Sequence, residues 1–244
     1  MWTALRQRAG LRESIDILEI GAGTGIATGP LLAHRPRRLT AVESDERLAR
    51  FLSASQPSPP LDLIVSPFEA AALPPAAYDL VVSATAFHWL DAVPALRRIN
   101  TLLRPGGRVA LWWNVFGDAE RPDPFHDATM HLFSRAAEGT VDPAGRPAEP
   151  GLAADQWLSA FDEAGFTPHP PQVERWTLVL DPTAVRSLYA SFSNVTTLQP
   201  DARDALLDRL ADIAVNQFGG RVERNMTTAI YTAGLPDAAS YPLC

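Results

Sequence analysis

A glycine-rich turn near the N-terminus constrains the fold more than any other feature of the chain. An apolar run, Ile15–Ile20, predicts a strand, and Gly21, Gly23 and Gly25 follow it at alternate positions before a helical stretch. Alternate glycines let the backbone turn tightly and let a ligand lie against bare main chain. A strand, a glycine turn and a helix in this order are typical of a doubly wound α/β sheet, which binds its ligands at the carboxyl ends of its strands.

The rest of the first half alternates short apolar runs with stretches of helical spacing. This alternation predicts βαβ units and a parallel sheet. The further predicted strands cover residues 39–42, 61–65, 78–83 and 108–114, with helices after Asp45 and over 93–103 and a loop at 55–60. Because the strands are almost continuously apolar, we expect helices to cover both faces of the sheet.

The composition changes after about residue 115, where Pro, Gly, Asp and Glu become frequent. We interpret residues 115–165, which hold predicted helices at 124–137 and 157–164, as a helical cap inserted after the fifth strand. Two late strands, 174–180 and 226–232, flank a helix at 201–215. The prediction is one domain over residues 1–235, with a binding core at 15–115, late elements at 170–235 and a tail at 236–244.

Charge and hydropathy exclude several classes of partner. The net charge is −7 and no long basic run occurs, whereas nucleic-acid binding draws its affinity from many cations. No apolar run approaches the ~20 residues that span a bilayer, and the first residues lack the order of a secretory signal. We therefore expect a cytoplasmic monomer or homodimer that acts on a small molecule, without a nucleic-acid or membrane partner.

Metal and thiol chemistry find little support in the sequence. The single cysteine is Cys244, so neither an internal disulfide nor a cysteine-based metal site is expected. The five histidines are scattered, and His126 and His131 are five residues apart, which does not place them on one helix face. We predict no metal site.

Two ligands compete for the glycine turn. A dinucleotide site has the pattern Gly-x-Gly-x-x-Gly, whose third glycine would fall at Ile26 instead of Gly25. Glu19, two residues before the first glycine, suits a pyrophosphate poorly, but it can pin the loop or help to receive an ammonium group. S-adenosylmethionine has no phosphate and carries a sulfonium and an amino group, so the spacing favours it over NAD.

A second carboxylate supports a nucleoside ligand without choosing between the two. Glu43 ends the second predicted strand, 18 residues after Gly25. There it can accept hydrogen bonds from both ribose hydroxyls, a feature of NAD and S-adenosylmethionine sites alike. The alternative is that Glu43 is merely a solvated strand end.

Five motifs follow one another in a recognisable order over residues 15–115. They are Glu19-x-Gly21-x-Gly23-x-Gly25, the strand end Val42-Glu43, the strand at 78–83, the pair His88-Trp89, and Leu103-Arg104-Pro105-Gly106-Gly107. Together they resemble the class I S-adenosylmethionine-dependent methyltransferases, and more narrowly the type 11 group that includes trans-aconitate methyltransferase-like proteins. The resemblance implies a seven-stranded, mostly parallel sheet whose last strand is antiparallel.

The resemblance also implies the residues of the site. The cofactor S-adenosyl-L-methionine would be held by Glu19, Gly21, Ala22, Gly23, Gly25, Glu43, Ser44, Phe68 and Ser83. Phe68 would flank the adenine or else be ordinary core, and Ser83 would lie near the methionine moiety. His88 is the candidate catalytic residue, because its ordinary pKa of about 6.5 suits a proton acceptor. The alternative for His88 is a structural role.

Other aromatic residues lie close to the inferred site. Trp89 is more often packing than a substrate platform, and Trp112 and Trp113 must face opposite sides of the sheet because they are consecutive in a strand.

The predicted function is methyl transfer from S-adenosylmethionine to O, N or C of a small molecule. One alternative is a catalytically degenerate binding protein of the same fold, because relatives carry a covering helix before the first strand and only about 14 residues precede it here. An NAD-dependent oxidoreductase is the other alternative, disfavoured by Ile26 and by the absence of a Tyr-x-x-x-Lys pair.

Overall fold

The computed structural model describes residues 1–56, 61–117, 121–134 and 150–236. Parts of three sequence predictions lie outside these residues: the end of the loop at 55–60, the middle of the cap with the end of its helix at 124–137, and nearly all of the tail at 236–244. Among the described helices, none is long and apolar enough to cross a membrane.

The N-terminal half forms the elements that its apolar pattern predicts, preceded by a short helix. These are α1 (Trp2–Arg8), β1 (Asp16–Ile20), α2 (Thr28–Ala33), β2 (Arg38–Glu43), α3 (Glu46–Ser55), β3 (Leu61–Val65), η1 (Phe68–Ala70), β4 (Tyr78–Ala84), η2 (Phe87–Trp89), α4 (Ala92–Leu102) and β5 (Leu103–Phe116). Asp45 caps α3 as predicted, because its carboxylate accepts a hydrogen bond from the backbone N–H of Arg47. The sequence analysis did not predict α1, whose Ala4 and Leu5 are buried in the core.

The C-terminal half adds helices and three further strands. They are α5 (Pro124–Ser134), η3 (Pro150–Leu152), α6 (Ala154–Glu163), β6 (Thr167–Pro168), β7 (Gln172–Leu180), α7 (Pro182–Ala190), α8 (Ser193–Thr196), α9 (Pro200–Phe218) and β8 (Val222–Gly234). Gly165 follows α6 with a positive φ of 83°, where the sequence predicts the end of that helix.

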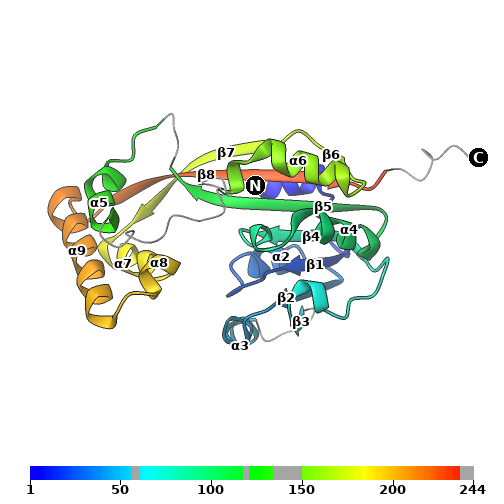
Figure 1. The fold of residues 1–244 in the computed structure, drawn as a ribbon, viewed down its shortest axis with the longest axis horizontal. Coiled ribbons are helices and arrows are strands. Elements are labelled where there is room, and N and C mark those ends of the chain that lie inside the picture. Colours follow the sequence, from blue (N-terminus) through cyan, green and yellow to red (C-terminus); the bar gives the residue numbers. More distant parts are fainter. Residues whose placement is uncertain (57–60, 118–120, 135–149, 237–244) are drawn as a thin grey trace, which may run out of the picture. The chain divides into compact units, whose positions relative to one another are not determined.

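The strands form one sheet in the order β3-β2-β1-β4-β5-β8-β6 (Figure 1). Strands β1 to β5 pair in parallel, and β6 pairs with β8 in the antiparallel sense. Figure 1 shows β5 and β8 running in opposite directions. The doubly wound, mostly parallel sheet predicted from the sequence is thus confirmed; among the described residues, β7 pairs with β8 as an eighth strand outside the seven-strand path.

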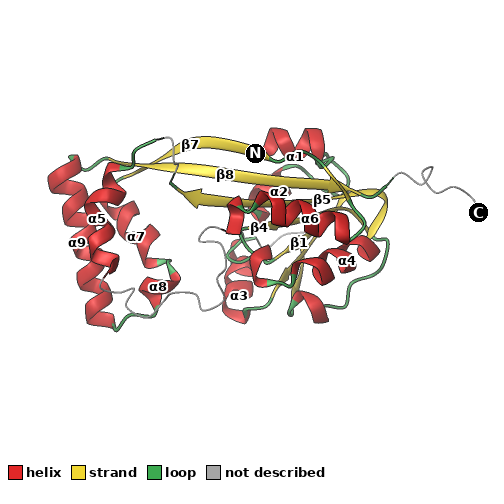
Figure 2. Cartoon of the chain, turned by 45° about the horizontal axis from the view of Figure 1, so that its top comes forward, coloured by secondary structure: helices red, strands yellow, loops and turns green. Residues whose placement is uncertain are grey.

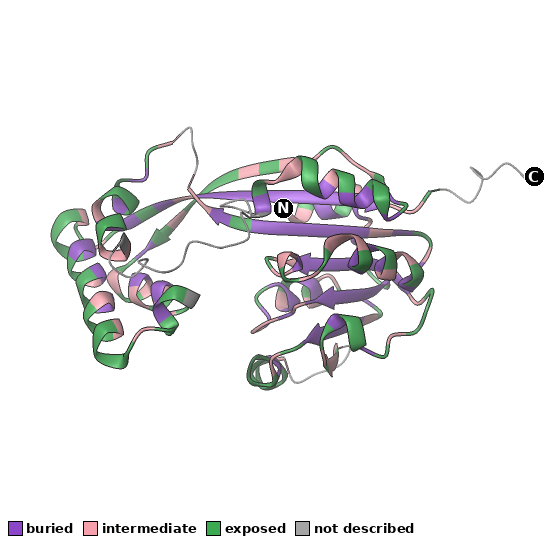
Figure 3. Ribbon diagram, viewed as in Figure 1, coloured by how far each residue is buried: buried purple, intermediate pink, exposed green. Residues whose placement is uncertain are grey.

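The central strands are buried because helices cover them (Figures 2 and 3). All five residues of β1 are buried, as are the last five of β2. On one face the core joins α1 and α2 to β1, β4 and β5, and it includes Trp112. Trp113 instead stacks on Trp157 of α6, with ring centroids 4.7 Å apart. The predicted opposite orientation of the two tryptophans is therefore confirmed.

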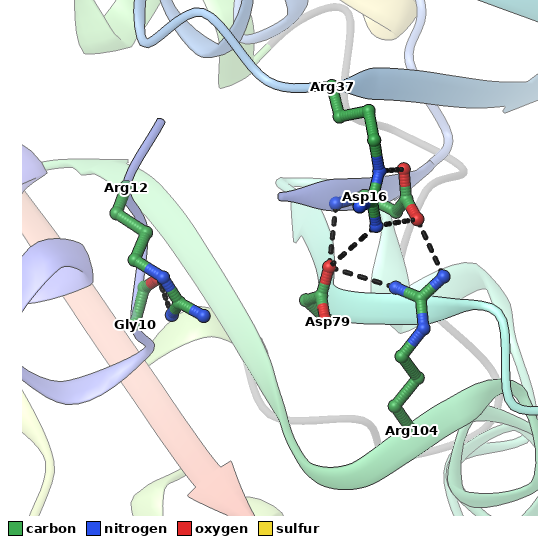
Figure 4. A network of polar contacts seen from close by, with 6 residues as sticks. All are labelled: Gly10, Arg12, Asp16, Arg37, Asp79 and Arg104. Carbon is green, nitrogen blue, oxygen red and sulfur yellow. Dashed lines mark hydrogen bonds and ion pairs between the residues drawn. The ribbon is translucent and has the colours of Figure 1, made fainter. Parts of the chain in front are cut away.

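A network of two carboxylates and two arginines closes the N-terminal ends of the parallel strands (Figure 4). The buried Asp16 accepts hydrogen bonds from Arg37 at 2.5 and 3.0 Å and from Arg104 at 2.6 Å. Asp79 accepts from Arg104 at 2.9 Å and from the backbone N–H of Asp16 at 2.8 Å. The bond from Arg37 is the main cause that lowers the pKa of Asp16 to about 2. Asp79 and Arg104, which the sequence analysis grouped with the family motifs, thus have a structural role here.

The chain divides into two compact units. Unit 1 comprises residues 1–114, 149–174 and 228–244, and unit 2 comprises residues 115–148 and 175–227. Unit 2 therefore takes in α7, α8 and α9 as well as α5, whereas α6 belongs to unit 1. That unit 2 serves as a cap remains a prediction.

Unit 2 has its own core, centred on a buried ion pair. The guanidinium of Arg224 donates to the carboxylate of Asp123 at 2.8 Å and also to the hydroxyl of Tyr189. The ring centroid of Phe116 lies 4.9 Å from this guanidinium. The cost of desolvating two charges is offset by these hydrogen bonds and by the aromatic contact, so we assign the cluster a structural role.

Candidate active site

The glycine turn folds back on the end of β2. The backbone N–H of Gly21 donates to the carbonyl of Val42 at 2.8 Å, and that of Gly25 donates to the carbonyl of Ala22 at 3.0 Å. Gly21 and Gly25 have φ of 70° and 92°, and a Cβ at either would lie 2.5 Å from Ala86 or 2.6 Å from Leu52. Both positions therefore require glycine, for conformation and for space.

Gly23 is different, because among the described residues, its two chain neighbours apart, no heavy atom lies within 4 Å of the position that its Cβ would take. The middle of the turn thus faces open space. The helix α2 begins at Thr28 and not directly after Gly25, and Ile26 between them is 85% exposed. The sequence analysis placed the start of this helix too early.

Glu19 is buried at the carboxyl end of β1, and only one of its two carboxylate oxygens has a hydrogen-bond partner among the described residues. Oε2 accepts a hydrogen bond from the hydroxyl of Thr28 at 2.7 Å. Oε1 is buried and has no hydrogen-bond partner among the described residues. Burial raises the pKa of Glu19 to about 7; the bond from Thr28 opposes this rise, and the negative charge of Glu43 adds to it.

Glu43, at the end of β2, is held by the backbone on both sides. Oε2 accepts from the N–H of Gly23 at 2.7 Å, and Oε1 accepts from the N–H of Asp45 at 2.8 Å. A carboxylate has about four acceptor sites, so both oxygens keep capacity for further donors. The structure thus brings together Glu19, Glu43 and the glycine turn. Ser44, the next residue, is exposed.

Two other predicted residues lie around this edge. The hydroxyl of Ser83, at the end of β4, donates to the carbonyl of Ile20 at 2.9 Å and ties β4 to the start of the glycine turn. Phe68 is 3% exposed, and the guanidinium of Arg98 lies 5.1 Å from its ring centroid. Phe68 therefore packs as core; its contact with an adenine remains a prediction.

His88 is held in place by a tryptophan. The indole Nε1–H of Trp113 donates to Nδ1 of His88 at 3.0 Å. An indole nitrogen only donates, so Nδ1 must be the acceptor and the neutral ring carries its proton on Nε2. Trp113 is itself fixed between Trp157 and Tyr231, whose hydroxyl donates to the carbonyl of Gly151 at 2.7 Å.

The arrangement of carboxylates and glycines coincides with a match to a known family. Residues 18–111 match the family described as methyltransferase domain, a range that includes every predicted site residue. Over this range the chain is similar to a methyltransferase domain. Its proposed place in the trans-aconitate methyltransferase-like subgroup remains a prediction.

Individual relatives agree with this assignment. The chain is 24% identical over 233 residues to an uncharacterized methyltransferase of Schizosaccharomyces pombe, covering 94% of this chain and 87% of that protein. It shares its fold with a putative type II methyltransferase from Anaeromyxobacter dehalogenans (TM-score 0.64, 21% identity, 96% and 94% covered). It also shares it with Haemonchus contortus phosphoethanolamine N-methyltransferase 2 in complex with S-adenosyl-L-methionine (TM-score 0.54, 15% identity, 97% of this chain and 52% of that one).

The sequence analysis missed Thr28 and Ala86, which position the site, and it placed Trp113 near the site without predicting its role. Thr28 holds Glu19, Ala86 contacts Gly21, and Trp113 holds His88. A hydroxyl in the first turn of the helix after the glycines was a usable signal for Thr28. The partner of His88 depends on the register of β4 and β5, in which Ala84 pairs with Trp112, and no local pattern reveals it.

Proposed function

We propose that this protein transfers a methyl group from S-adenosylmethionine to O, N or C of a small-molecule acceptor. The observation that carries the proposal is Oε1 of Glu19, a buried oxygen without a hydrogen-bond partner among the described residues. Such an atom is costly unless a ligand satisfies it. A cationic ligand such as the amino group of S-adenosylmethionine would also favour the ionised form of a carboxyl whose pKa is raised to about 7.

The residues around Glu19 fit the rest of this cofactor. The open space beside Gly23 admits a ligand against the main chain, and Glu43 has acceptor capacity for ribose hydroxyls. When bound, S-adenosylmethionine supplies a methyl group that its positively charged sulfur makes electrophilic. The task of this chain is then to orient the cofactor and the acceptor and to exclude water, since alignment alone can lower a barrier by several kcal/mol.

The same residues argue against NAD. The third glycine of a dinucleotide site, which lets the helix pack closely on the strand, is replaced by Ile26, whose side chain is 85% exposed. A second negative charge from Glu19 beside Glu43 would repel a pyrophosphate. We therefore keep an NAD-dependent oxidoreductase only as an outcome of the test.

We propose that His88 positions the acceptor. Nδ1 already accepts a hydrogen bond from Trp113, so uptake of a proton there would require that bond to break. A carboxylate acceptor needs no base at all, because it has no proton to lose on methylation. The role of His88 as a general base remains a prediction, as does a cytoplasmic location for the reaction.

Calorimetric titration with S-adenosylmethionine, S-adenosylhomocysteine and NAD tests the proposal. We expect the first two to bind with one site per chain and NAD not to bind. Gly23→Val should abolish binding because its side chain fills the open space, and Glu43→Ala should weaken it. Gly106→Val is the matched control, since Gly106, near the start of β5 at the other end of the sheet, also has a positive φ, 74°, and open surroundings among the described residues.

Turnover separates an enzyme from a degenerate binding protein. Formation of S-adenosylhomocysteine would be followed with a panel of phenols, carboxylic acids and amines. Methylation of at least one class supports the proposal, whereas cofactor binding without turnover of any class favours the binding protein. Binding of NAD alone would overturn the assigned cofactor.

A further inference from the structure

The segment after β4 lies directly against the glycine turn. A Cβ on Gly21 would be 2.5 Å from the side chain of Ala86, and Ser83 bonds the carbonyl of Ile20. Thr85 begins the segment with φ of 53°, a left-handed conformation unusual for a residue other than glycine. Its N–H donates to the carbonyl of Trp112 at 2.7 Å. Residues 85–89 therefore border the cofactor end of the sheet.

The short helix η2 in this segment sends its three aromatic residues in different directions. Phe87 is fully buried and meets the edge of Trp157, with ring centroids 6.0 Å apart. His88 is anchored by Trp113. Trp89 lies against His88, with ring centroids 4.9 Å apart, and is 76% exposed. Phe87 and His88 thus hold η2 against the protein, while the indole of Trp89 remains exposed to solvent.

Trp89 is the most exposed of the six tryptophans, all of which the structure describes. Trp112, Trp113 and Trp157 are 2–3% exposed. The sequence analysis favoured packing over a substrate platform for Trp89; at this exposure the indole is not part of the core. Covering a large exposed apolar ring with a ligand is favourable because it removes apolar surface from water, and an indole face is well covered by another planar ring.

We propose that the indole of Trp89 is the platform on which the methyl acceptor stacks, and that this acceptor is an uncharged or anionic aromatic compound such as a phenol or an aryl carboxylate. The inference rests on the proposed function, because it places the acceptor beside the cofactor. Stacking would orient a flat molecule without demanding a particular hydrogen-bond pattern.

The chemistry of methyl transfer argues against a cationic acceptor on this indole, although cations also bind indole faces. The acceptor atom must offer a lone pair, which an ammonium group does not have. A positive acceptor would also be repelled by the positive sulfur of the cofactor. The exposed carboxylate of Asp91 lies two residues from Trp89, so a cationic ligand must be included among the probes.

The test uses calorimetry on the full chain with two probes of the same carbon skeleton, 2-naphthol and its saturated form decahydro-2-naphthol. Affinity for S-adenosylhomocysteine is measured first in every variant and should not change in Trp89→Leu. With the nucleoside bound, we expect 2-naphthol to bind at least about tenfold more tightly than the saturated probe. Trp89→Leu should weaken 2-naphthol by about tenfold or more, and Trp89→Phe by less than about threefold.

Trp176→Leu is the matched control, because Trp176 of β7 is the next most exposed tryptophan, at 38%. It should leave the affinity for 2-naphthol unchanged. An unchanged affinity in Trp89→Leu, no binding of 2-naphthol, or tighter binding of phenyltrimethylammonium than of 2-naphthol would each overturn the proposal. Absence of S-adenosylhomocysteine binding would overturn the proposed function instead. In that case, titrations of 2-naphthol without the nucleoside measure stacking on Trp89 independently of the cofactor.

Discussion

The two ends of β1 carry buried carboxylates with opposite environments. Asp16 begins the strand and is met by Arg37 and Arg104, so its pKa falls to about 2. Glu19, three residues later, has no arginine beside it; burial, together with the negative charge of Glu43, raises its pKa to about 7 although the hydroxyl of Thr28 opposes the rise. The same strand thus holds a compensated carboxylate, Asp16, at one edge of the sheet. At the other edge it holds Glu19, which has no compensating positive charge among the described residues.

This difference in surroundings distinguishes a carboxylate that stabilises the fold, Asp16, from one that we expect to contact a ligand, Glu19. Ion-pair networks and functional sites both shift pKa values, and the direction distinguishes them here. At Asp16 the arginines are already in place, so the folded chain is the compensated state. At Glu19 the compensating group is missing from the described residues, so the chain accepts a cost in stability that a cation can remove.

The largest expected effect on stability comes from Asp16→Asn, which removes the carboxylate that pairs with Arg37 and Arg104. Two arginines would lose their shared carboxylate, and we expect the free energy of unfolding at pH 7 to fall by about 3 kcal/mol. Urea denaturation measures it. Affinity for S-adenosylhomocysteine should not change, because Asp16 lies at the opposite edge of the sheet; a parallel loss of affinity would show that the two ends are not independent.

The wild-type protein should show the matching acid dependence. A pKa lowered from 3.8 to about 2 means that the contribution of Asp16 is present above pH 3.8 and is lost as the pH falls toward 2. We expect a loss of about 2 kcal/mol over that range from this group. Asp16→Asn should lack this component, and an equal slope in both proteins would assign the acid sensitivity elsewhere.

Glu19→Gln tests the uncompensated carboxylate at the other end of β1. Because the folded-state pKa is raised from 4.5 to about 7, stability of the ligand-free protein should decline between these pH values, since the unfolded chain releases the proton while the buried carboxyl still holds it. The neutral amide removes that decline, and we expect about 2 kcal/mol more stability at pH 8 by thermal or urea unfolding. The same variant should bind S-adenosylmethionine about 10- to 100-fold more weakly, since a charge-assisted bond is lost.

A gain in stability together with a loss of affinity is the decisive pattern. If Glu19→Gln destabilised the protein at pH 8, the carboxylate would be a structural group like Asp16. Glu19→Asp is a useful control, because it keeps the charge and shortens the side chain.

Glu43→Gln has a smaller expected effect, because Glu43 is compensated by backbone alone. The carbonyl oxygen of the amide would still accept a hydrogen bond from the backbone N–H of Gly23 or of Asp45. The amide nitrogen, which is a donor, would then face the other backbone N–H and could not accept from it. We expect about a tenfold loss of affinity for S-adenosylhomocysteine, measured by calorimetry, and a loss of stability of about 1 kcal/mol from the unpaired N–H group. A loss of stability as large as that of Asp16→Asn would contradict a role directed at the ligand.

The sequence predicted the edge of the sheet that carries the candidate site better than the edge that carries the ion-pair network. Glu19, the glycines and Glu43 are close to strand ends, where strand–turn–helix order alone places them together. The ion-pair network joins residues 16, 37, 79 and 104, which meet only through the order of the strands in the sheet, so no local pattern predicted it. Exposure of Trp89 was equally hidden, because η2 is a single turn without periodicity.

The fold was predictable for a similar reason, and its exceptions are short or composite elements. Apolar runs bounded by glycine, proline and acidic residues marked five parallel strands correctly. α1 has only seven residues and no acidic residue in its first turn, and β6 has only two residues. Unit 2 draws on two separate stretches of chain, so a boundary read along the sequence does not describe it.

Trp113→Phe has the smallest expected effect and tests how the functional edge is held. Phenylalanine retains an aromatic ring against Trp157 and Tyr231 but removes the N–H that holds Nδ1 of His88. Loss of one hydrogen bond should cost about 1 kcal/mol and lower kcat severalfold, without changing affinity for S-adenosylhomocysteine. If His88 only positions the acceptor, the pH profile of kcat stays unchanged. A rise in kcat on removal of this hydrogen bond would instead identify Nδ1 as the general base.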